Sequence, residues 1–368
     1  MNARGILAKL EDFRLLPFFV IFSMAIGILI GNALNISDFT LTPPIDAIKS
    51  IVGGTFEPTV ASVISLGVPI GLFLMMYPAM TNVRLTEIGD AFRSPKQLAV
   101  VLFFNFAIAP FFMLGLANLF VSDPELHTGL VLYGLAPCIA MVIIFTFLAK
   151  GNVPMALVFV AFNSVAQMLL IPVYASLLIG NVSFDVLLVG ESVILYLGLP
   201  LLLGVITRQL VVRRGGEEAM ERLKPGLSAL SILGLLFTLI IMFALKGDLI
   251  LQRPAIVLEM AIPMTIFFVV MFFVVLMVSW RLHFNYRDSV AVAFNATGRD
   301  FEIAIAIAIT AFSPTVALAT VVGPLIEVPV MLALVWSALR LRPRLFPGDV
   351  EASEGRPQEA AAVAPTGP

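Results

Sequence analysis

One carboxylate lies in strongly apolar surroundings. Glu302 is followed by residues 303–309, a run that contains only Ile and Ala. A charged side chain at the depth of a bilayer costs at least roughly 2.5 to 3.5 kcal/mol, so it faces a cavity, pairs with another charge, or binds and releases a proton. We therefore expect Glu302 to belong to a functional site in the interior.

Two more charged residues lie three and two positions before Glu302, and a third carboxylate follows later. Arg299 and Asp300 either belong to the same cavity or form a local ion pair, which lowers the cost of burying both charges without touching a ligand. Glu327 lies in the last apolar segment. It is either a proton relay or a hydrogen-bond partner that holds neighbouring helices together, and the residues alone leave both interpretations open.

Cys138 is the only cysteine of the chain. The chain can therefore form neither an intrachain disulfide nor a site with several thiolates. A lone cysteine is either a small buried apolar residue or a thiol that binds a ligand, and the first is the commoner case. The neighbours of Cys138, among them Pro137, do not decide between the two.

Amide and hydroxyl side chains recur in the same apolar segments. In membrane helices such groups either form hydrogen bonds between helices or contact a substrate. Both interpretations stay open for Asn105, Asn163, Asn295 and Thr297.

The elements that carry these residues must be membrane helices. Of the 368 residues 60% are hydrophobic, the mean hydropathy is +1.04, and only 12% are charged, about half the share of a soluble domain. Apolar stretches long enough to cross about 30 Å of hydrocarbon as helix recur ten times, near 15–34, 57–80, 97–121, 127–149, 153–180, 185–207, 226–245, 255–280, 286–311 and 314–340. These stretches predict an all-α polytopic membrane protein with ten transmembrane helices.

The distribution of basic residues tests this topology, because Lys and Arg accumulate in cytoplasmic loops. With a cytoplasmic N-terminus, 18 of the 22 Lys and Arg residues fall in cytoplasmic segments and three in outer loops. The remaining one, Arg299, falls inside a predicted span. We expect both termini to be cytoplasmic, and residues 343–368, rich in Pro, Ala, Glu and Gly, to form a disordered tail.

Ten spans divide into two halves of five, and an odd number per half gives the halves opposite orientations. Shifting the second half by 160 residues places Pro137-Cys138 opposite Thr297-Gly298. Each half then has a helix-breaking residue within its fourth span, which predicts two discontinuous helices in an inverted repeat. Broken helices at membrane depth line a cavity, and their ends carry partial charges, so we expect the binding site there.

No His-rich metal motif, nucleophile elbow or phosphate-binding loop is present, so we expect neither an enzyme nor a bound cofactor or metal. The net charge of −2 indicates no nucleic-acid partner, and the residues indicate no particular oligomeric state.

Several segments resemble those of the arsenical-resistance permeases, the arsenite exporters of the bile acid, arsenite and riboflavin transporter superfamily. They are residues 71–78 (GLFLMMYP), 134–142 (GLAPCIAMV), 148–151 (LAKG), 301–306 (FEIAIA) and 317–330 (ALATVVGPLIEVPV). The resemblance spans most of the chain.

The resemblance implies an integral membrane transporter over residues 1–342. A panel domain is expected near 14–95 and 183–250, and a core domain near 96–182 and 251–342. It further implies export of arsenic(III) hydroxide, and of antimonite, across the plasma membrane in exchange for protons. The family's motif cysteine falls on Cys138 and its motif glutamate on Glu302. The expected translocation site comprises Cys138, Glu302, Arg299, Asn105, Asn163, Glu327 and Thr297.

The chain departs from the family pattern near both breaks. Pro137 stands where the family usually has Arg, Arg299-Asp300 where it has two asparagines, and Phe145-Thr146 where it has Trp-Asn. Our hypothesis is that the guanidinium has moved from one broken helix to the other. The alternative is a changed cavity that serves sodium-coupled transport of an organic anion or an organoarsenical.

Overall fold

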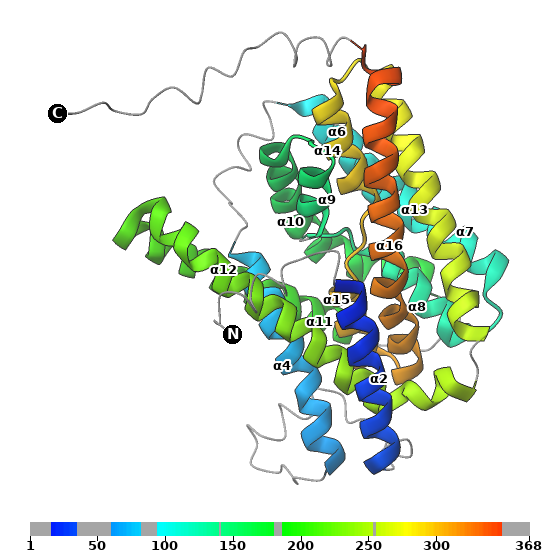
Figure 1. Cartoon of the computed structure of the whole chain (residues 1–368). Helices are drawn as coiled ribbons and strands as arrows, with labels where there is room; N and C mark the ends of the chain where they lie inside the picture. Colours follow the sequence, from blue (N-terminus) through cyan, green and yellow to red (C-terminus); the bar gives the residue numbers. More distant parts are fainter. Residues whose placement is uncertain are drawn as a thin grey trace.

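The computed structural model describes residues 16–34, 60–81, 94–139, 141–179, 186–252 and 255–347. Regular secondary structure in these ranges is helical throughout (Figure 1). The helices are α2 (Leu16–Leu34), α4 (Val60–Met80), α6 (Pro95–Leu102), η3 (Phe103–Ile108), α7 (Ala109–Phe120), α8 (Pro124–Leu135), α9 (Met141–Leu148), α10 (Val153–Leu178), α11 (Val186–Val193), η4 (Ile194–Gly198), α12 (Leu199–Gln252), α13 (Ala255–Arg281), α14 (Tyr286–Thr297), α15 (Phe301–Ala311) and α16 (Pro314–Leu345).

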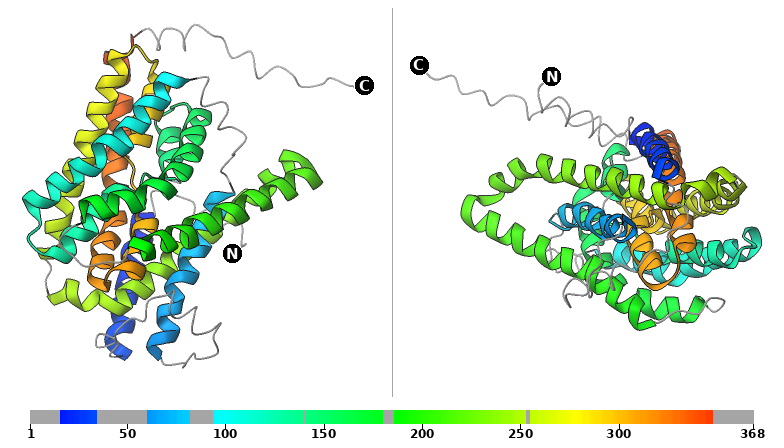
Figure 2. Two further views of the ribbon diagram at one scale, coloured as in Figure 1. Left: turned by 180° about the vertical axis from the view of Figure 1, so that it is seen from behind. Right: turned by 90° about the horizontal axis from the view of Figure 1, so that it is seen from below.

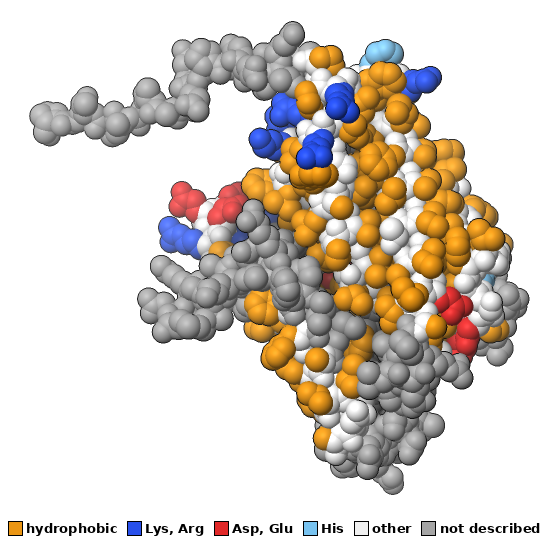
Figure 3. Space-filling model, turned by 45° about the vertical axis from the view of Figure 1, so that its right-hand side comes forward, with side chains coloured by type: hydrophobic (Ala, Val, Ile, Leu, Met, Phe, Trp, Pro, Cys, Tyr) orange, Lys and Arg blue, Asp and Glu red, His pale blue; other side chains and the backbone are white. Residues whose placement is uncertain are grey.

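The outer surface of these helices is apolar, as a bilayer requires. Large hydrophobic side chains point outward, such as Leu119 at 73% exposure and Leu169 at 71%. Figure 3 shows hydrophobic side chains over much of one face, with Lys and Arg gathered near one end. Five described helical segments are long and apolar enough to cross a membrane: Pro95–Phe120, Val153–Leu178, Val189–Ile241, Ala255–Arg281 and Thr315–Leu345. The expectation of an all-helical membrane protein is confirmed.

One group of helices consists of α2, α4 and α12. The long helix α12 turns back on itself at Gly216, whose φ of 70° and ψ of −175° are non-helical and belong to the region that glycine adopts without strain. Its two arms enclose α4, as the view from below in Figure 2 shows, and α12 packs extensively against both α4 and α2. The stretches expected as spans 185–207 and 226–245 thus fall on α11, η4 and the two arms of α12.

A second group surrounds two interrupted helices. The long helices α13 and α16 pack against each other, α13 also contacts α7 and α14, and α16 also contacts α8 and α15. The expected interruptions are confirmed: α8 ends at Leu135 before α9 begins at Met141, and α14 ends at Thr297 before α15 begins at Phe301. The four half-helices meet in the interior of this group.

Two π-helical turns interrupt other helices where the sequence predicted regular helix. They are η3 and η4. In η3 the carbonyl oxygen of Phe106 accepts a hydrogen bond from the hydroxyl of Tyr174 on α10. Such turns displace backbone groups from the regular ladder and are frequent at functional sites.

The last helix extends beyond its expected end. α16 continues to Leu345, so it covers the first residues of the stretch 343–368 that was expected to be a tail. Residues 348–368 lie outside the described part of the chain.

Glycines allow α12 and α4 to touch, which gives a test of the packing. A methyl group at Gly234 would lie 2.7 Å from the backbone nitrogen of Met75 and 3.0 Å from the carbonyl oxygen of Gly71. Because neither backbone atom can turn aside, we expect Gly234→Ala to lower the stability by about 1 to 3 kcal/mol. The control is Gly115→Ala, where a methyl group meets no atom within 4 Å. Thermal unfolding of both purified variants in detergent measures the difference, and equal melting temperatures would contradict the packing.

Candidate functional site

The two interrupted helices cross where their unwound segments pair as extended backbone, at residues 136–138 and 298–300. We call this place the crossing. Pro137 and Arg299 form an isolated antiparallel bridge. The amide of Cys138 donates to the carbonyl of Gly298 at 3.0 Å, and the amide of Asp300 donates to the carbonyl of Ala136 at 2.8 Å. Each unwound segment therefore supplies hydrogen-bond partners that the other has lost, which is what unwound backbone requires in an apolar interior.

Gly298 allows this close approach. A methyl group at this position would lie 2.3 Å from Cγ1 of Val142 and 3.1 Å from Cβ of Cys138. Glycine is needed here for space, since its φ of −61° is open to any residue.

The side chain of Arg299 is fully buried at the crossing and makes four hydrogen bonds. Its Nη2 donates to Oδ1 of Asn105 and to the carbonyl of Ala296, both at 2.6 Å. Its Nη1 donates to the carbonyl of Gly134 and its Nε to that of Thr297, both at 3.2 Å. The guanidinium also lies over the ring of Phe267, 5.3 Å from the centroid.

These carbonyl partners belong to the last turns of α8 and α14. The last carbonyls of a helix have no intrahelical partner and carry a partial negative charge. One guanidinium therefore caps the C-terminal ends of both half-helices. The unwound segments end in the N-termini of α9 and α15, which carry the opposite partial charge.

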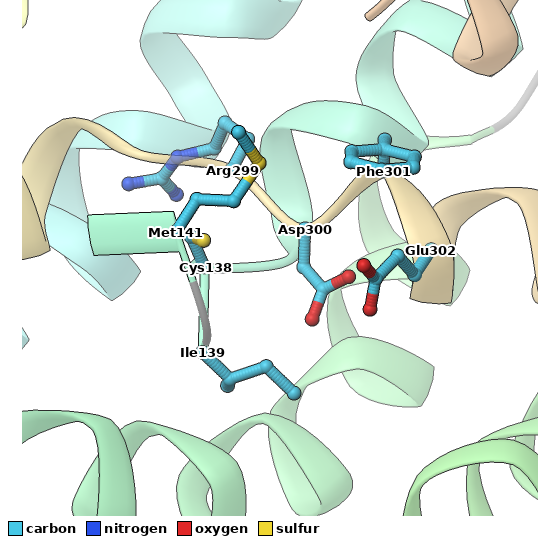
Figure 4. Close-up of a pocket in the computed structure, with 7 residues that line it drawn as sticks. All are labelled: Cys138, Ile139, Met141, Arg299, Asp300, Phe301 and Glu302. Atoms are coloured by element: carbon cyan, nitrogen blue, oxygen red, sulfur yellow. The ribbon is translucent and has the colours of Figure 1, made fainter. Parts of the chain in front are cut away.

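The local pair between Arg299 and Asp300, one of the two sequence interpretations, is not formed. The guanidinium points to the opposite side of the crossing from the carboxylates of Asp300 and Glu302 (Figure 4). Among the described residues, neither carboxylate takes part in an ion pair. The reason is geometric: Arg299 lies in extended backbone, where consecutive side chains point to opposite sides, and its guanidinium donates to the carbonyls of two helix ends instead.

Glu327 on α16 is a hydrogen-bond acceptor at the crossing. Its Oε2 accepts from the hydroxyl of Tyr133 at 2.6 Å, and its Oε1 accepts from the backbone amide of Arg299 at 3.3 Å. The side chain is fully buried. Both oxygens thus join α16 to the broken helices, as the structural interpretation expects, and the proton relay stays a prediction.

The side-chain amides predicted for the site lie next to the guanidinium of Arg299 and bond to one another. Asn105, on the π-turn η3, donates to the carbonyl of Asn295 at 3.1 Å and to Oδ1 of Asn163 at 3.3 Å. Thr297 instead donates its hydroxyl to the carbonyl of Ala293, one turn back in its own helix. Buried polar atoms without a partner remain on three of the neighbouring amides: Nδ2 of Asn163, Oδ1 of Asn295, and both Nε2 and Oε1 of Gln167.

A small cavity lies on the other side of the crossing. Its volume is about 10 Å³, and it is lined by Cys138, Ile139, Met141, Arg299, Asp300, Phe301 and Glu302 (Figure 4). This volume is close to the smallest that holds one water molecule. Of the predicted site residues, Cys138, Arg299 and Glu302 line the cavity. The other four, Asn105, Asn163, Thr297 and Glu327, are not among its lining residues.

Sequence reasoning missed Met141, Tyr133 and Phe267. Tyr133 had a usable signal, since it lies four residues before Pro137 and thus one helical turn below the break. Met141 and Phe267 carry no local signal, because apolar residues surround both in sequence.

The chain resembles known transporters over most of its length. Residues 69–253 match the model of the sodium bile acid symporter family. The arsenical-resistance protein Acr3 of Corynebacterium glutamicum is 36% identical over 352 residues, 91% of each chain. The Acr3 protein of Alkaliphilus metalliredigens is 36% identical over 76% of this chain and 83% of its own, and an uncharacterized transporter of Synechocystis is 33% identical over 83% and 89%.

The capping role of Arg299 can be tested by stability. Arg299→Gln leaves buried carbonyls at two helix ends without a cation, so we expect a loss of about 3 kcal/mol or more. Arg222→Gln is the control, because the side chain of Arg222 is 83% exposed and pairs only with Glu218 at 3.8 Å among described residues. Thermal unfolding in detergent measures both. If Arg299→Gln unfolds at the wild-type temperature, the guanidinium does not hold the crossing.

Proposed function

The chain belongs to the sodium bile acid symporter family and is a relative of its arsenical-resistance transporters, and from this premise we propose that it exports arsenite, and also antimonite, in exchange for protons. The observation that carries the proposal is the cavity at the crossing, where the only thiol of the chain lies beside buried carboxylates. The cargo is arsenic(III) hydroxide, a small neutral molecule.

The proposed architecture has ten spans in two inverted halves of five, with both termini in the cytoplasm of a plasma-membrane protein. Three observations support it. Both interruptions lie at matching positions of a 160-residue shift, the four half-helices meet in one interior, and the charge distribution assigns alternate loops to the cytoplasm. In this architecture α2, α4 and α12 form the panel, and the helices around the crossing form the core.

Cys138 is the proposed arsenic ligand. Its side chain is 4% exposed and lines the cavity. Arsenic(III) is thiophilic, as other soft centres are. The thiol gives up its proton to one hydroxide of the cargo, an S–As bond forms as an As–O bond breaks, and one water molecule leaves. A single thiol makes this exchange reversible, whereas three thiolates would retain the arsenic.

Glu302 is the proposed proton carrier. The side chain is 9% exposed, and its Oε2 has no hydrogen-bond partner. Burial of an unpaired carboxylate is costly, so the empty site binds a proton. Hydroxyl groups of the cargo donate to the carboxylate when they replace this proton, so cargo and proton occupy the site in turn.

The small volume of the cavity indicates that the site must open to admit the cargo. A volume of about 10 Å³ accommodates about one water molecule. An arsenic atom with three hydroxyl groups needs more space than this. Loading therefore requires the core to move against the panel, as in transporters that expose one site alternately to the two sides. The described conformation is closed around the crossing.

The bridge between Pro137 and Arg299 supports the hypothesis of a relocated guanidinium. The family places its arginine at the position of Pro137, and Arg299 is the residue paired directly with it. A cation at either position therefore enters the same crossing, and arsenite export is compatible with the exchange.

The alternative is cation-coupled transport of an organic anion or an organoarsenical. The unpartnered oxygens of Asn295 and Gln167 favour it, since buried amide oxygens suit a hard cation such as sodium. Sodium dependence of transport distinguishes this alternative from proton exchange.

The direct test of export is arsenic accumulation in an arsenite-sensitive cell that expresses the chain. We expect the wild type to lower cellular arsenic several-fold, and Cys138→Ala and Glu302→Gln to abolish most of the effect. Glu259→Gln is the control, because this carboxylate contacts the backbone of Ser122, away from the crossing. Unchanged arsenic content with well-expressed wild type would refute the proposal.

The relocation hypothesis has its own test in the double variant Pro137→Arg, Arg299→Asn. We expect it to retain more transport than Arg299→Asn alone, because a guanidinium at position 137 restores a cation at the crossing. Transport assays on the three proteins at matched expression measure this, and a double variant no better than the single one contradicts it.

A further inference from the structure

Two acidic side chains at the crossing face each other. Asp300 caps α15, with its Oδ1 accepting a hydrogen bond from the amide of Ile303 at 3.1 Å, and Glu302 lies in the first turn of the same helix. They are 3% and 9% exposed. Figure 4 shows their carboxylates pointing toward one another beside the cavity that both line.

The buried guanidinium of Arg299 forms no ion pair with Asp300 or Glu302. The guanidinium of Arg299 is occupied by Asn105 and by three carbonyls at the ends of α8 and α14. Among the ion pairs of the described residues, none includes Asp300 or Glu302.

The other groups around the pair add no positive charge. Glu327 approaches from α16 and accepts hydrogen bonds from Tyr133 of α8 and from the backbone of Arg299. Cys138 lines the same cavity from the other broken helix. The crossing thus holds one guanidinium and three carboxyl groups. If the positive charge of Arg299 neutralises the negative charge of Glu327, ionised Asp300 and Glu302 would place two negative charges side by side in a closed site.

One oxygen of each carboxyl group also lacks a hydrogen-bond donor. Oδ2 of Asp300 and Oε2 of Glu302 are both buried, and neither has a partner. One proton resolves both problems, because it removes one of the two charges and lets one carboxyl group donate to the other. Such an O–H···O⁻ bond is short and strong, and two carboxylates that share a site do not both ionise.

We propose that Asp300 and Glu302 bind one proton between them, which makes Asp300 a second proton-binding residue of the translocation site. The proton comes from the water on one side, where an O–H bond of hydronium breaks as the carboxyl O–H bond forms, and the reverse exchange returns it to the water on the other side. Its use in transport rests on the proposed function, whereas the shared proton itself does not.

Asp300→Asn separates proton binding from helix capping. Asparagine retains an oxygen that accepts from the amide of Ile303, so the cap is kept, while the titratable group is lost. Glu302→Gln is the reciprocal change and reports on Asp300 alone, which keeps the test available if one variant fails to fold. Glu259→Gln, remote from the crossing, is the matched control.

The measurement is the infrared carbonyl-stretch band of protonated carboxyl groups, followed against pH in reconstituted membranes without arsenite. We expect a band in the wild type at neutral pH that Glu259→Gln leaves unchanged. In Asp300→Asn and in Glu302→Gln the neighbouring negative charge is gone, so the remaining carboxyl group holds its proton less tightly. Its band should therefore fall to half intensity at a proton concentration about tenfold higher or more than in the wild type, that is, at a lower pH. A wild type without the band at neutral pH, or variants with the wild-type pH dependence, would overturn the pair.

Arsenite transport by the same proteins separates this proposal from the proposed function. A wild type that shows the shared-proton behaviour but moves no arsenite would refute arsenite export and leave the pair intact. If the wild type transports arsenite, Asp300→Asn should shift the pH profile of transport in the same direction as the infrared signal. A transport profile that does not move would contradict a role of Asp300 in coupling.

Discussion

The arrangement of the core depends on the exchange of hydrogen bonds between two stretches of unwound backbone. Cys138 donates to Gly298, and Asp300 donates to Ala136. An apolar interior tolerates unwound backbone only where its polar groups find partners, and each stretch here is the partner of the other. The close approach at Gly298 and the acceptors on Glu327 hold this exchange in place, and the four half-helices take their positions from it.

The crossing also separates charge. The C-terminal ends of α8 and α14 are capped by the buried guanidinium of Arg299, while the carboxylates of Asp300 and Glu302 lie on the opposite side, beside the cavity. The cation thus stabilises helix ends without neutralising the carboxylates. We propose that these carboxylates bind protons and hydroxyl groups of a cargo, next to the one thiol. In the mechanism that we propose, structure and proton coupling depend on different charges within four consecutive residues.

Much of this was predictable from sequence, for identifiable reasons. Helix-breaking residues in two apolar segments predicted both interruptions, and the cost of a buried carboxylate singled out Glu302. The destination of the Arg299 side chain was not predictable, because its partners Asn105 and Gly134 lie 194 and 165 residues away. The π-turn at residues 103–108 was not predictable either, since no residue within it breaks a helix. Local patterns indicate where a helix stops, and only tertiary contacts decide which groups satisfy the freed backbone.

The central claim is that the cavity beside the crossing receives arsenic(III) on Cys138. Because this is the only cysteine of the chain, alkylation by a small maleimide in reconstituted membranes reports on a single site. The account predicts that arsenite slows the labelling of Cys138 in a concentration-dependent way, and that Glu259→Gln behaves like the wild type. A labelling rate that is the same with and without saturating arsenite would contradict it.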